Sequence, residues 1–496
     1  MTTECNAMLF EFQSLGAREV VGRFDGGTIS SDGGGVLLRE VEVKTGILRQ
    51  FAACFTDHRD PELIEFTVAE LLAQRVYALA LGYEDLLDHD DLRHDPLLAT
   101  LVGKSDPSGQ ERVRDRDRGK PLAGKSTLNR LELTPAGADE GSRYKKVVMH
   151  TDGVDALFVN VFLQAHATPL RRITIDLDST FAPLHGHQLG RFFHGYYDCY
   201  CYLPLYVFCG EHLLAARLRP SDIDGAAGAL DIVRRIVARI RQAWPTVEIV
   251  LRGDSGFTRE PIMAWCEENN VEYLFGLARN ARLCRIIGAE LHQAKLAFDQ
   301  TGQAARIFSE FDYTTRKSWS CERRVVAKAE HLAKGSNPRF VVTNIPAEQY
   351  DAQTLYEQEY CARGEMENRI KEQQLYLFAD RVSAATMRAN QLRLYEAAVA
   401  YLLIHALRRL GLKDTPLEQA QAPTIRQKLL KIGTLVRVTV RKVWLAWSQA
   451  YPYQELFRRI HENLSRLAPI VAPPSSGPAP VPLRCPAPWR PPPLAG

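Results

Sequence analysis

The sequence predicts an α/β fold in which helices flank a mixed sheet. In residues 173–178, three aliphatic side chains alternate with Thr174, Asp176 and Asp178, as in a strand that buries one face. The periodicity of the later residues predicts, in order, strands over 203–209 and 212–218, a helix over 230–240, a strand ending at Asp254, a helix over 261–268 and a strand over 273–277.

This order of elements is that of an RNase H-like core: three strands, a helix, a strand, a helix and a strand. In such a core, Asp178 and Asp254 end neighbouring strands. A carboxylate at the end of a buried strand costs free energy unless a cation meets it. A divalent metal ion can supply that charge, and hard carboxylate oxygens favour Mg2+ or Mn2+. Asp176 competes with Asp178 for this role, because both lie on one face of the predicted strand.

A third acid lies in the segment that follows residue 350. At helical spacing, Tyr360, Arg363, Glu367 and Lys371 fall within one stripe. Such a stripe suits a metal ion beside a phosphodiester, since the acid can hold the ion while the bases and the phenol hold phosphate oxygens. The alternative is a solvated helix face on which Arg363 and Glu367 pair one turn apart.

Together these segments resemble the DDE transposases of bacterial insertion sequences, in particular the insertion-sequence-four superfamily with its Y-R-E-K signature and, within it, the thirteen-eighty group. The matching residues are Asp178, Ser179 and Thr180 for the first aspartate motif, Asp254 for the second, and Tyr360, Arg363 and Glu367 for the start of the signature. The lysine of the signature is replaced by Gln374, and Lys371, one turn nearer the glutamate, is its expected substitute.

The resemblance implies a transposase that binds the terminal inverted repeats of its element, cleaves DNA phosphodiesters with two Mg2+ ions and transfers the freed 3′-OH to target DNA. Mn2+ can substitute for Mg2+. Asp178, Asp254 and Glu367 are then the catalytic and metal-binding residues, with Asp178 bridging the ions. The implied roles of Tyr360, Arg363 and Lys371 are contacts with DNA phosphates.

The expected partners are double-stranded DNA, as element ends and as target, and a second copy of the chain in a synaptic homodimer. The resemblance also suggests a hairpin intermediate on the element end. Two other functions remain open: a metal-dependent DNA nuclease without strand transfer, and a non-catalytic DNA-binding regulator.

The chain is expected to divide into several regions. They are a helical N-terminal DNA-end-binding domain (1–145), the first part of the catalytic core (146–285), a β-rich insertion (286–350), the second part of the core with the glutamate helix (351–410), a helical C-terminal region (411–468) and a disordered proline-rich tail (469–496).

Two basic segments are predicted to contact DNA. The segment 111–130 has seven basic and three acidic residues, and 426–442 has six basic residues and no acid. The candidate contacts are Arg112, Arg114, Arg116, Arg118, Lys125, Arg437, Arg441 and Lys442. A solvated linker is the alternative for the first segment, and a dimer contact is the alternative for the second.

The net charge of +3 is too small to indicate a nucleic-acid partner by itself. The first residues lack the basic and apolar regions of a signal peptide, and the longest apolar stretch, 397–404, is too short to cross a bilayer. The sequence therefore predicts a cytoplasmic protein without a membrane partner. The resemblance adds a bacterial, nucleoid-associated location.

Overall fold

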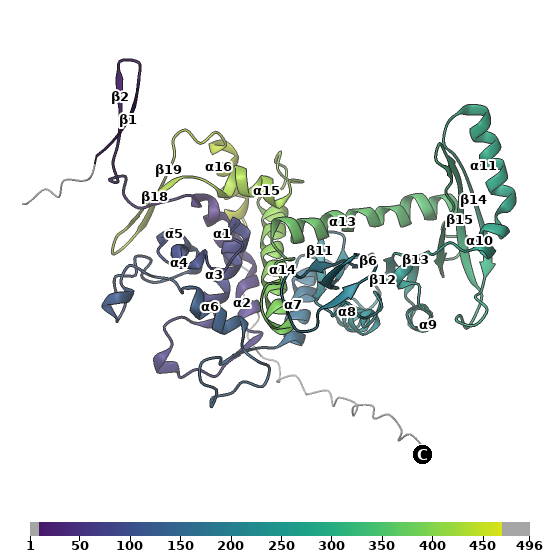
Figure 1. Cartoon of the computed structure of the whole chain (residues 1–496), viewed down its shortest axis with the longest axis horizontal. Coiled ribbons are helices and arrows are strands. Elements are labelled where there is room, and N and C mark those ends of the chain that lie inside the picture. The colour runs from purple at the N-terminus through teal and green to yellow at the C-terminus, as the bar shows by residue number, and fades with distance from the viewer. Residues whose placement is uncertain (1–8, 469–496) are drawn as a thin grey trace, which may run out of the picture.

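The structure is a computed structural model that describes residues 9–468. Its largest feature is a nine-stranded mixed sheet in the order β11-β10-β6-β12-β13-β17-β15-β14, with the short β16 beside β15 (Figure 1). The strands are β6 (Arg172–Ser179), β10 (Leu205–Cys209), β11 (His212–Arg217), β12 (Glu248–Gly253), β13 (Glu272–Leu277), β14 (Ala305–Tyr313), β15 (Arg323–Leu332), β16 (Gly335–Ser336) and β17 (Arg339–Thr343). A mixed sheet among helices confirms the predicted α/β class.

The centre of the sheet is parallel and its flanks are antiparallel. Strands β6, β12 and β13 run parallel, while β10 pairs with β6, and β17 pairs with β13, in antiparallel fashion. In the β6–β12 pair, Asp176 lies opposite Arg252 and Leu177 lies opposite Gly253. The next residue of each strand is Asp178 or Asp254, so these two acids reach the same edge of the sheet.

The two faces of β6 have different surroundings. Its three aliphatic side chains are buried with apolar side chains of α8 (Ala229–Ala243) and α9 (Glu260–Glu268). The other face carries Asp176 and Asp178 and meets the helical segment 352–376. The predicted separation of aliphatic and acidic side chains is therefore confirmed, and it results from the two-residue period of a strand.

The segment 352–376 is helical throughout but changes its winding. It consists of α12 (Ala352–Thr354), a π-helical turn (Leu355–Tyr360), a 3-10 turn (Cys361–Arg363), α13 (Gly364–Lys371) and a second π-helical turn (Glu372–Tyr376). Figure 1 shows this segment passing from the region of α14 (Met387–Leu410) across to the strands β14 and β15. Short π-helical turns are frequent at functional sites, because they re-aim the side chains around them.

The residues between β13 and the segment 352–376 extend the central sheet. They form α10 (Ala281–Ile286), α11 (Gly288–Thr301) and the strands β14 to β17. Strand β17 pairs with β13, β15 with β17, and β14 with β15. The alternation that predicted strands here is present, and α11 packs against β14 and β15 (Figure 1).

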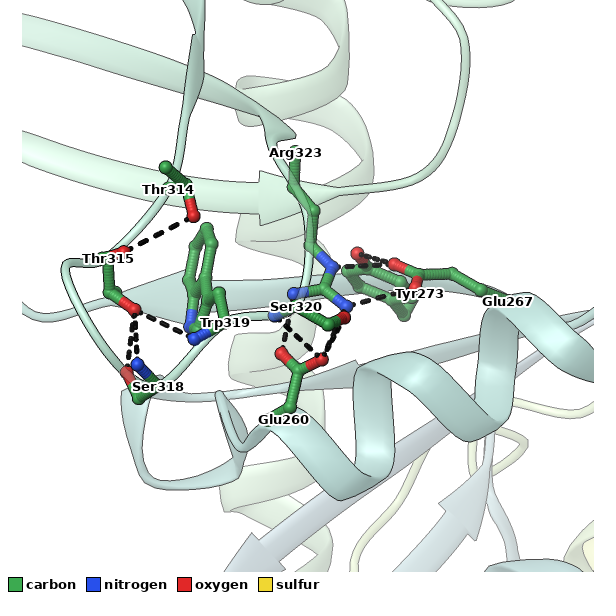
Figure 2. Close-up of polar contacts among 9 residues, drawn as sticks. All are labelled: Glu260, Glu267, Tyr273, Thr314, Thr315, Ser318, Trp319, Ser320 and Arg323. Atoms are coloured by element: carbon green, nitrogen blue, oxygen red, sulfur yellow. Dashed lines mark hydrogen bonds and ion pairs between the residues drawn. The ribbon is translucent and has the colours of Figure 1, made fainter.

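A buried arginine joins this added part of the sheet to α9 (Figure 2). The side chain of Arg323, on β15, is 2% exposed and donates to Glu260 at 2.6 Å and to Glu267 at 2.6 and 2.9 Å. Tyr273 donates to the same Glu267 at 2.8 Å, and the ring of Trp319 lies 5.4 Å from the guanidinium. Trp319 therefore packs within the fold, and the cluster fixes α9, which begins six residues after Asp254.

Helices from the N-terminal part pack around α14, which is buried along almost its whole length. They are α1 (Val36–Thr45), α2 (Ile47–Ala52), α3 (Val68–Leu81), α4 (His89–Leu92), α5 (Pro96–Val102), α6 (Lys125–Glu132) and α7 (Thr151–Gln164). The many apolar residues of 61–82 predict one continuous helix, but α3 begins at Val68. Thr67 and Glu70 form a reciprocal capping box there, which ends the chain's extended approach to the helix.

Two hairpins occur in regions that the sequence predicted to be helical. The first joins β1 (Phe10–Leu15) to β2 (Arg18–Gly22), and the second joins β18 (Thr434–Val438) to β19 (Val443–Trp447). Strand β18 also pairs with β3 (Ile29–Ser30). The β-branched residues of 434–443 favour a pleated strand over a helix, a signal that the basic side chains in the segment obscured.

The remaining elements are short or lie at the C-terminal end of the described chain. They are β4 (Phe55–Asp57), β5 (Val147–Met149), β7 (Ala182–Pro183), β8 (Phe192–His194), β9 (Cys199–Tyr202), α15 (Ala422–Ile425) and α16 (Gln454–Ser465). Among residues 9–468, none of the helices combines the length and apolar composition needed to span a bilayer. The predicted proline-rich tail lies outside the described residues.

Candidate active site

One guanidinium group joins two of the three predicted acids. Arg363 lies with its Nη1 atom 3.6 Å from Oδ2 of Asp178 and its Nη2 atom 3.4 Å from Oε1 of Glu367. Asp178 comes from the end of β6, whereas Arg363 and Glu367 come from the helical segment above it. The ion pair between Arg363 and Glu367, expected for a solvated helix face, is therefore present, but it extends to a catalytic candidate on another element.

The electrostatics place Asp254 in the same group. Burial raises the pKa of Asp178 to about 7, with the charges of Asp254 and Glu367 adding to the rise and that of Arg363 opposing it. Burial lowers the pKa of Arg363, but Asp178, Tyr360, Asp254 and Glu367 together raise it above its ordinary value. The charges of Asp254 and Glu367, from distant parts of the sequence, thus both act on Asp178 and on Arg363.

Asp176 has a different role from Asp178. Both of its carboxylate oxygens accept hydrogen bonds from Arg252, at 2.6 and 2.8 Å, and both residues are buried. Arg252 also donates to the backbone carbonyl of Glu359. This bidentate pair fixes β6 to β12 and to the helical segment, so Asp176 is occupied structurally. Among residues 9–468, the carboxylate of Asp178 forms one ion pair, the 3.6 Å contact with Arg363.

Tyr360 and Asp254 border a cavity of about 590 Å³ beside the acids. A methyl group added at Gly276 would lie 2.5 Å from the Tyr360 hydroxyl and 2.9 Å from the backbone nitrogen of Ser255. Only glycine at the end of β13 therefore lets the tyrosine reach this position. Arg363 lines the same cavity, which brings two residues of the predicted signature to its wall.

Gln374, which occupies the position of the missing signature lysine, makes a structural contact. Gln374 donates to the backbone carbonyl of Phe181 at 3.0 Å, just beyond the Asp178 motif. Lys371 is exposed on α13, one turn beyond Glu367, and its ammonium forms no ion pair with any residue between 9 and 468. Lys371 is therefore free to meet a ligand, whereas Gln374 ties the helix to the loop after β6.

The basic candidates outside this site lie on separate elements. Within the first segment, Arg112, Arg118 and Lys125 form ion pairs inside the chain at 3.0 to 3.1 Å, and Arg114 and Arg116 are exposed. None of these five lines the cavity beside Asp254.

The second basic segment forms the β18–β19 hairpin. Arg437 pairs with Trp444 across the two strands, and Lys442 lies 5.1 Å from the ring of the same tryptophan. Trp444 is 49% exposed, and Arg441 is in the turn. These side chains form a basic, aromatic surface apart from the cavity beside Asp254.

The acids suit a divalent cation in donor type and in charge. Carboxylate oxygens are the hard ligands that Mg2+ and Mn2+ prefer. Burial, followed by the charges of Asp254 and Glu367, raises the pKa of Asp178 despite the opposing charge of Arg363, and a bound cation would favour its ionised form. Within residues 9–468, no group of three His, Cys, Asp or Glu side chains converges closely enough to hold an ion. The residues therefore fit the ion chemically, while ligation requires the carboxylates to move closer together.

Sequence reasoning did not identify several residues that shape the site. Arg252 was detectable as a charged residue directly after the aliphatic run 249–251, but its partner depends on strand register. Gly276 was detectable only as a glycine in a predicted strand, a common sign of close backbone approach. Arg279 and Arg339 line the cavity from the loop after β13 and the start of β17. No local pattern marks these two arginines.

Comparison with known proteins assigns the chain to a family. The family model described as "Transposase DDE domain group 1" matches residues 12–469. The match spans most of the chain, which therefore belongs to the DDE transposase domain family, group 1.

The chain is similar to a piggyBac transposase in a cryo-electron microscopy structure of its synaptic complex with hairpin DNA, at 10% sequence identity and a TM-score of 0.39. The alignment covers 90% of this chain and 87% of that chain. No match was found among curated proteins.

Proposed function

We propose that the protein is an active transposase of the insertion-sequence-four type, closest in its signature to the thirteen-eighty group, with an RNase H-like catalytic core. It binds the terminal inverted repeats of its element as a homodimer, cleaves DNA phosphodiesters with two divalent ions and transfers the freed 3′-OH to target DNA. The observation that carries the proposal is the grouping of Asp178, Asp254 and Glu367 around Arg363. Family membership supports the same class of reaction.

The three acids are proposed as ligands of Mg2+, or of Mn2+ in its place. Two such ions, when bound, activate the attacking oxygen and stabilise charge on the leaving oxygen. Asp178 would contact both ions, and Asp254 and Glu367 one each.

The chain's own cations and phenol hold the DNA. Arg363 faces both the acids and the cavity, so its guanidinium can donate to a phosphate oxygen while it holds Asp178 and Glu367 in place. The Tyr360 hydroxyl, held over Gly276, can donate a second hydrogen bond to the same strand. Lys371, exposed on α13, adds charge on the outer side. These groups would orient the scissile phosphate for in-line attack.

The test uses the purified full-length protein, Mg2+ and a labelled duplex containing the inverted repeat that flanks its gene. The proposal predicts nicking at the element end, followed by joining of the 3′ end to a second DNA. Nicking without joining would identify a nuclease, and binding without nicking would identify a regulator. A hairpin on the element end, the route that the resemblance suggests, would be seen as a product that denatures to double length.

A matched set of variants tests the residue assignment. Asp178→Asn, Asp254→Asn and Glu367→Gln should each bind the duplex and fail to nick it. Glu365→Gln is the control, because Glu365 is an exposed acid on the same helix that pairs with no cation among the described residues. Normal nicking by any of the first three would remove that residue from the proposed site.

A further inference from the structure

The cavity beside Asp254 extends beyond the residues of the Y-R-E-K signature. Its volume is about 590 Å³, and its walls come from the end of β12, the loop after β13, the start of β17 and the helical segment 352–376. Asp254, Tyr360 and Arg363 form the side nearest the acids. Arg279 and Arg339 belong to the same lining, and neither belongs to the Y-R-E-K signature.

The charge of the lining favours an anion. Three guanidinium groups line it, those of Arg279, Arg339 and Arg363, against the single carboxylate of Asp254. Arg363 is already in contact with acids. Arg279 and Arg339 are both exposed, and neither forms an ion pair or a hydrogen bond with another side chain in the part of the chain that the structure describes. Two unpaired arginines facing one polar cavity suit phosphate groups, which guanidinium binds in a bidentate manner.

The pairing of strands β13 and β17 explains why Arg339 lines the same cavity as Asp254. Strand β17 pairs with β13, and Leu277 lies opposite Phe340. The residue before Phe340 and the residues after Leu277 therefore lie at the same edge of the sheet. The sheet extension that Arg323 clamps to α9 thus brings Arg339 to the cavity in a fixed position.

We infer that Arg279 and Arg339 form a second phosphate-binding subsite, which holds the DNA backbone next to the phosphodiester that is cleaved. The inference rests on the proposed function, because it takes the strand at the acids to be DNA. Arg363 and Tyr360 hold the scissile phosphate, and Arg279 and Arg339 hold the neighbouring phosphates of the same strand. The residues between β13 and the segment 352–376 thereby contribute to substrate positioning as well as to the sheet.

The test measures binding of a fluorescein-labelled duplex carrying the flanking inverted repeat, in EDTA so that no cleavage occurs. The variants are Arg279→Gln, Arg339→Gln and the double variant. The matched controls are Arg285→Gln and Lys334→Gln, which remove exposed cations on α10 and in the β15–β16 turn that do not line the cavity. Each variant is first checked for an unchanged melting temperature, as expected for exposed side chains.

The subsite predicts about tenfold weaker binding for the double variant, and a salt-dependence slope smaller by about 1 for each arginine removed. The controls should bind like the wild type. A duplex with an uncharged methylphosphonate next to the cleaved phosphate should weaken wild-type binding but not weaken the double variant further. Wild-type affinity and slope in the double variant, or equal losses in the controls, would overturn the subsite.

Nicking by the wild type in Mg2+, measured in parallel, separates the two proposals. Loss of binding in the double variant with no wild-type nicking would refute the proposed reaction and retain the subsite. Normal nicking by the wild type, together with unchanged binding by the double variant, would refute the subsite alone. Absence of binding by the wild type would overturn both.

Discussion

Asp176 and Asp178 lie two residues apart on one strand face, and replacing each by asparagine should change the stability in opposite directions. In metal-free buffer at neutral pH, Asp178→Asn should stabilise the fold, because it removes a carboxylate that burial and two neighbouring acids disfavour. Asp176→Asn should destabilise the fold, because it leaves the buried guanidinium of Arg252 without its counter-charge.

The magnitudes follow from the environments of the two side chains. The pKa of Asp178 is raised from 3.8 to about 7, which corresponds to roughly 4 kcal/mol at neutral pH. Local rearrangement and water reduce this value, since the side chain is 16% exposed, and we expect a gain of about 1–2 kcal/mol. Breaking a buried ion pair costs roughly 3–5 kcal/mol. Asparagine keeps one acceptor for Arg252, so we expect a loss of about 2–4 kcal/mol.

The assay is urea denaturation in EDTA, followed by tryptophan fluorescence and by circular dichroism at several pH values. An acid whose pKa is higher in the folded protein than in the unfolded chain favours folding most when it is protonated. The contribution of Asp178 to stability therefore falls as the pH rises from about 4 to about 7, and Asp178→Asn should remove this fall. Equal destabilisation by both variants would refute the distinction between a structural and a catalytic aspartate.

Three other substitutions, the first with a control, test separate parts of the account. Arg323→Met should lower the free energy of unfolding by about 2–4 kcal/mol in urea denaturation, because it leaves two partly buried carboxylates uncompensated. The control is Arg234→Met, at a half-exposed surface ion pair, which should change the free energy of unfolding by less than about 1 kcal/mol. Gly276→Ala should lower the nicking rate about tenfold or more, with a stability loss of only about 1–3 kcal/mol, because its methyl group would displace the signature tyrosine. Lys371→Gln should raise the KM for DNA and leave kcat unchanged, and an effect on kcat alone would contradict its assignment to phosphate binding.

The order of the main elements between residues 172 and 277 was predictable because each depends on local periodicity. The two-residue period of β6 identified its buried and acidic faces, and the apolar stripe of α8 identified a helix. The grouping of Asp178 with Asp254 followed from two adjacent strands that end in acids. Glu367 became a candidate through its helical spacing from Tyr360 and Arg363 together with the resemblance to the Y-R-E-K signature.

Other features depend on contacts between distant segments and could not be predicted. The choice between Asp176 and Asp178 was open in the sequence, because only the register of β6 against β12 brings Arg252 to Asp176. The cavity was also hidden, since Arg279 and Arg339 become neighbours only when β17 pairs with β13. The start of α3 was missed for a local reason, because its capping box outweighed the apolar residues before it.

Fe2+-directed cleavage of the polypeptide tests the central claim most directly. Fe2+ bound in place of Mg2+ reacts with added hydrogen peroxide to give Fe3+, hydroxide and hydroxyl radicals. The radicals cut the backbone close to the ion, and the cut sites can be mapped by mass spectrometry. The account predicts cuts near Asp178, Asp254 and Glu367 together, suppressed by excess Mg2+ and lost in Asp178→Asn. Cuts that cluster elsewhere, or that persist unchanged in that variant, would contradict a divalent-metal site formed by these three acids.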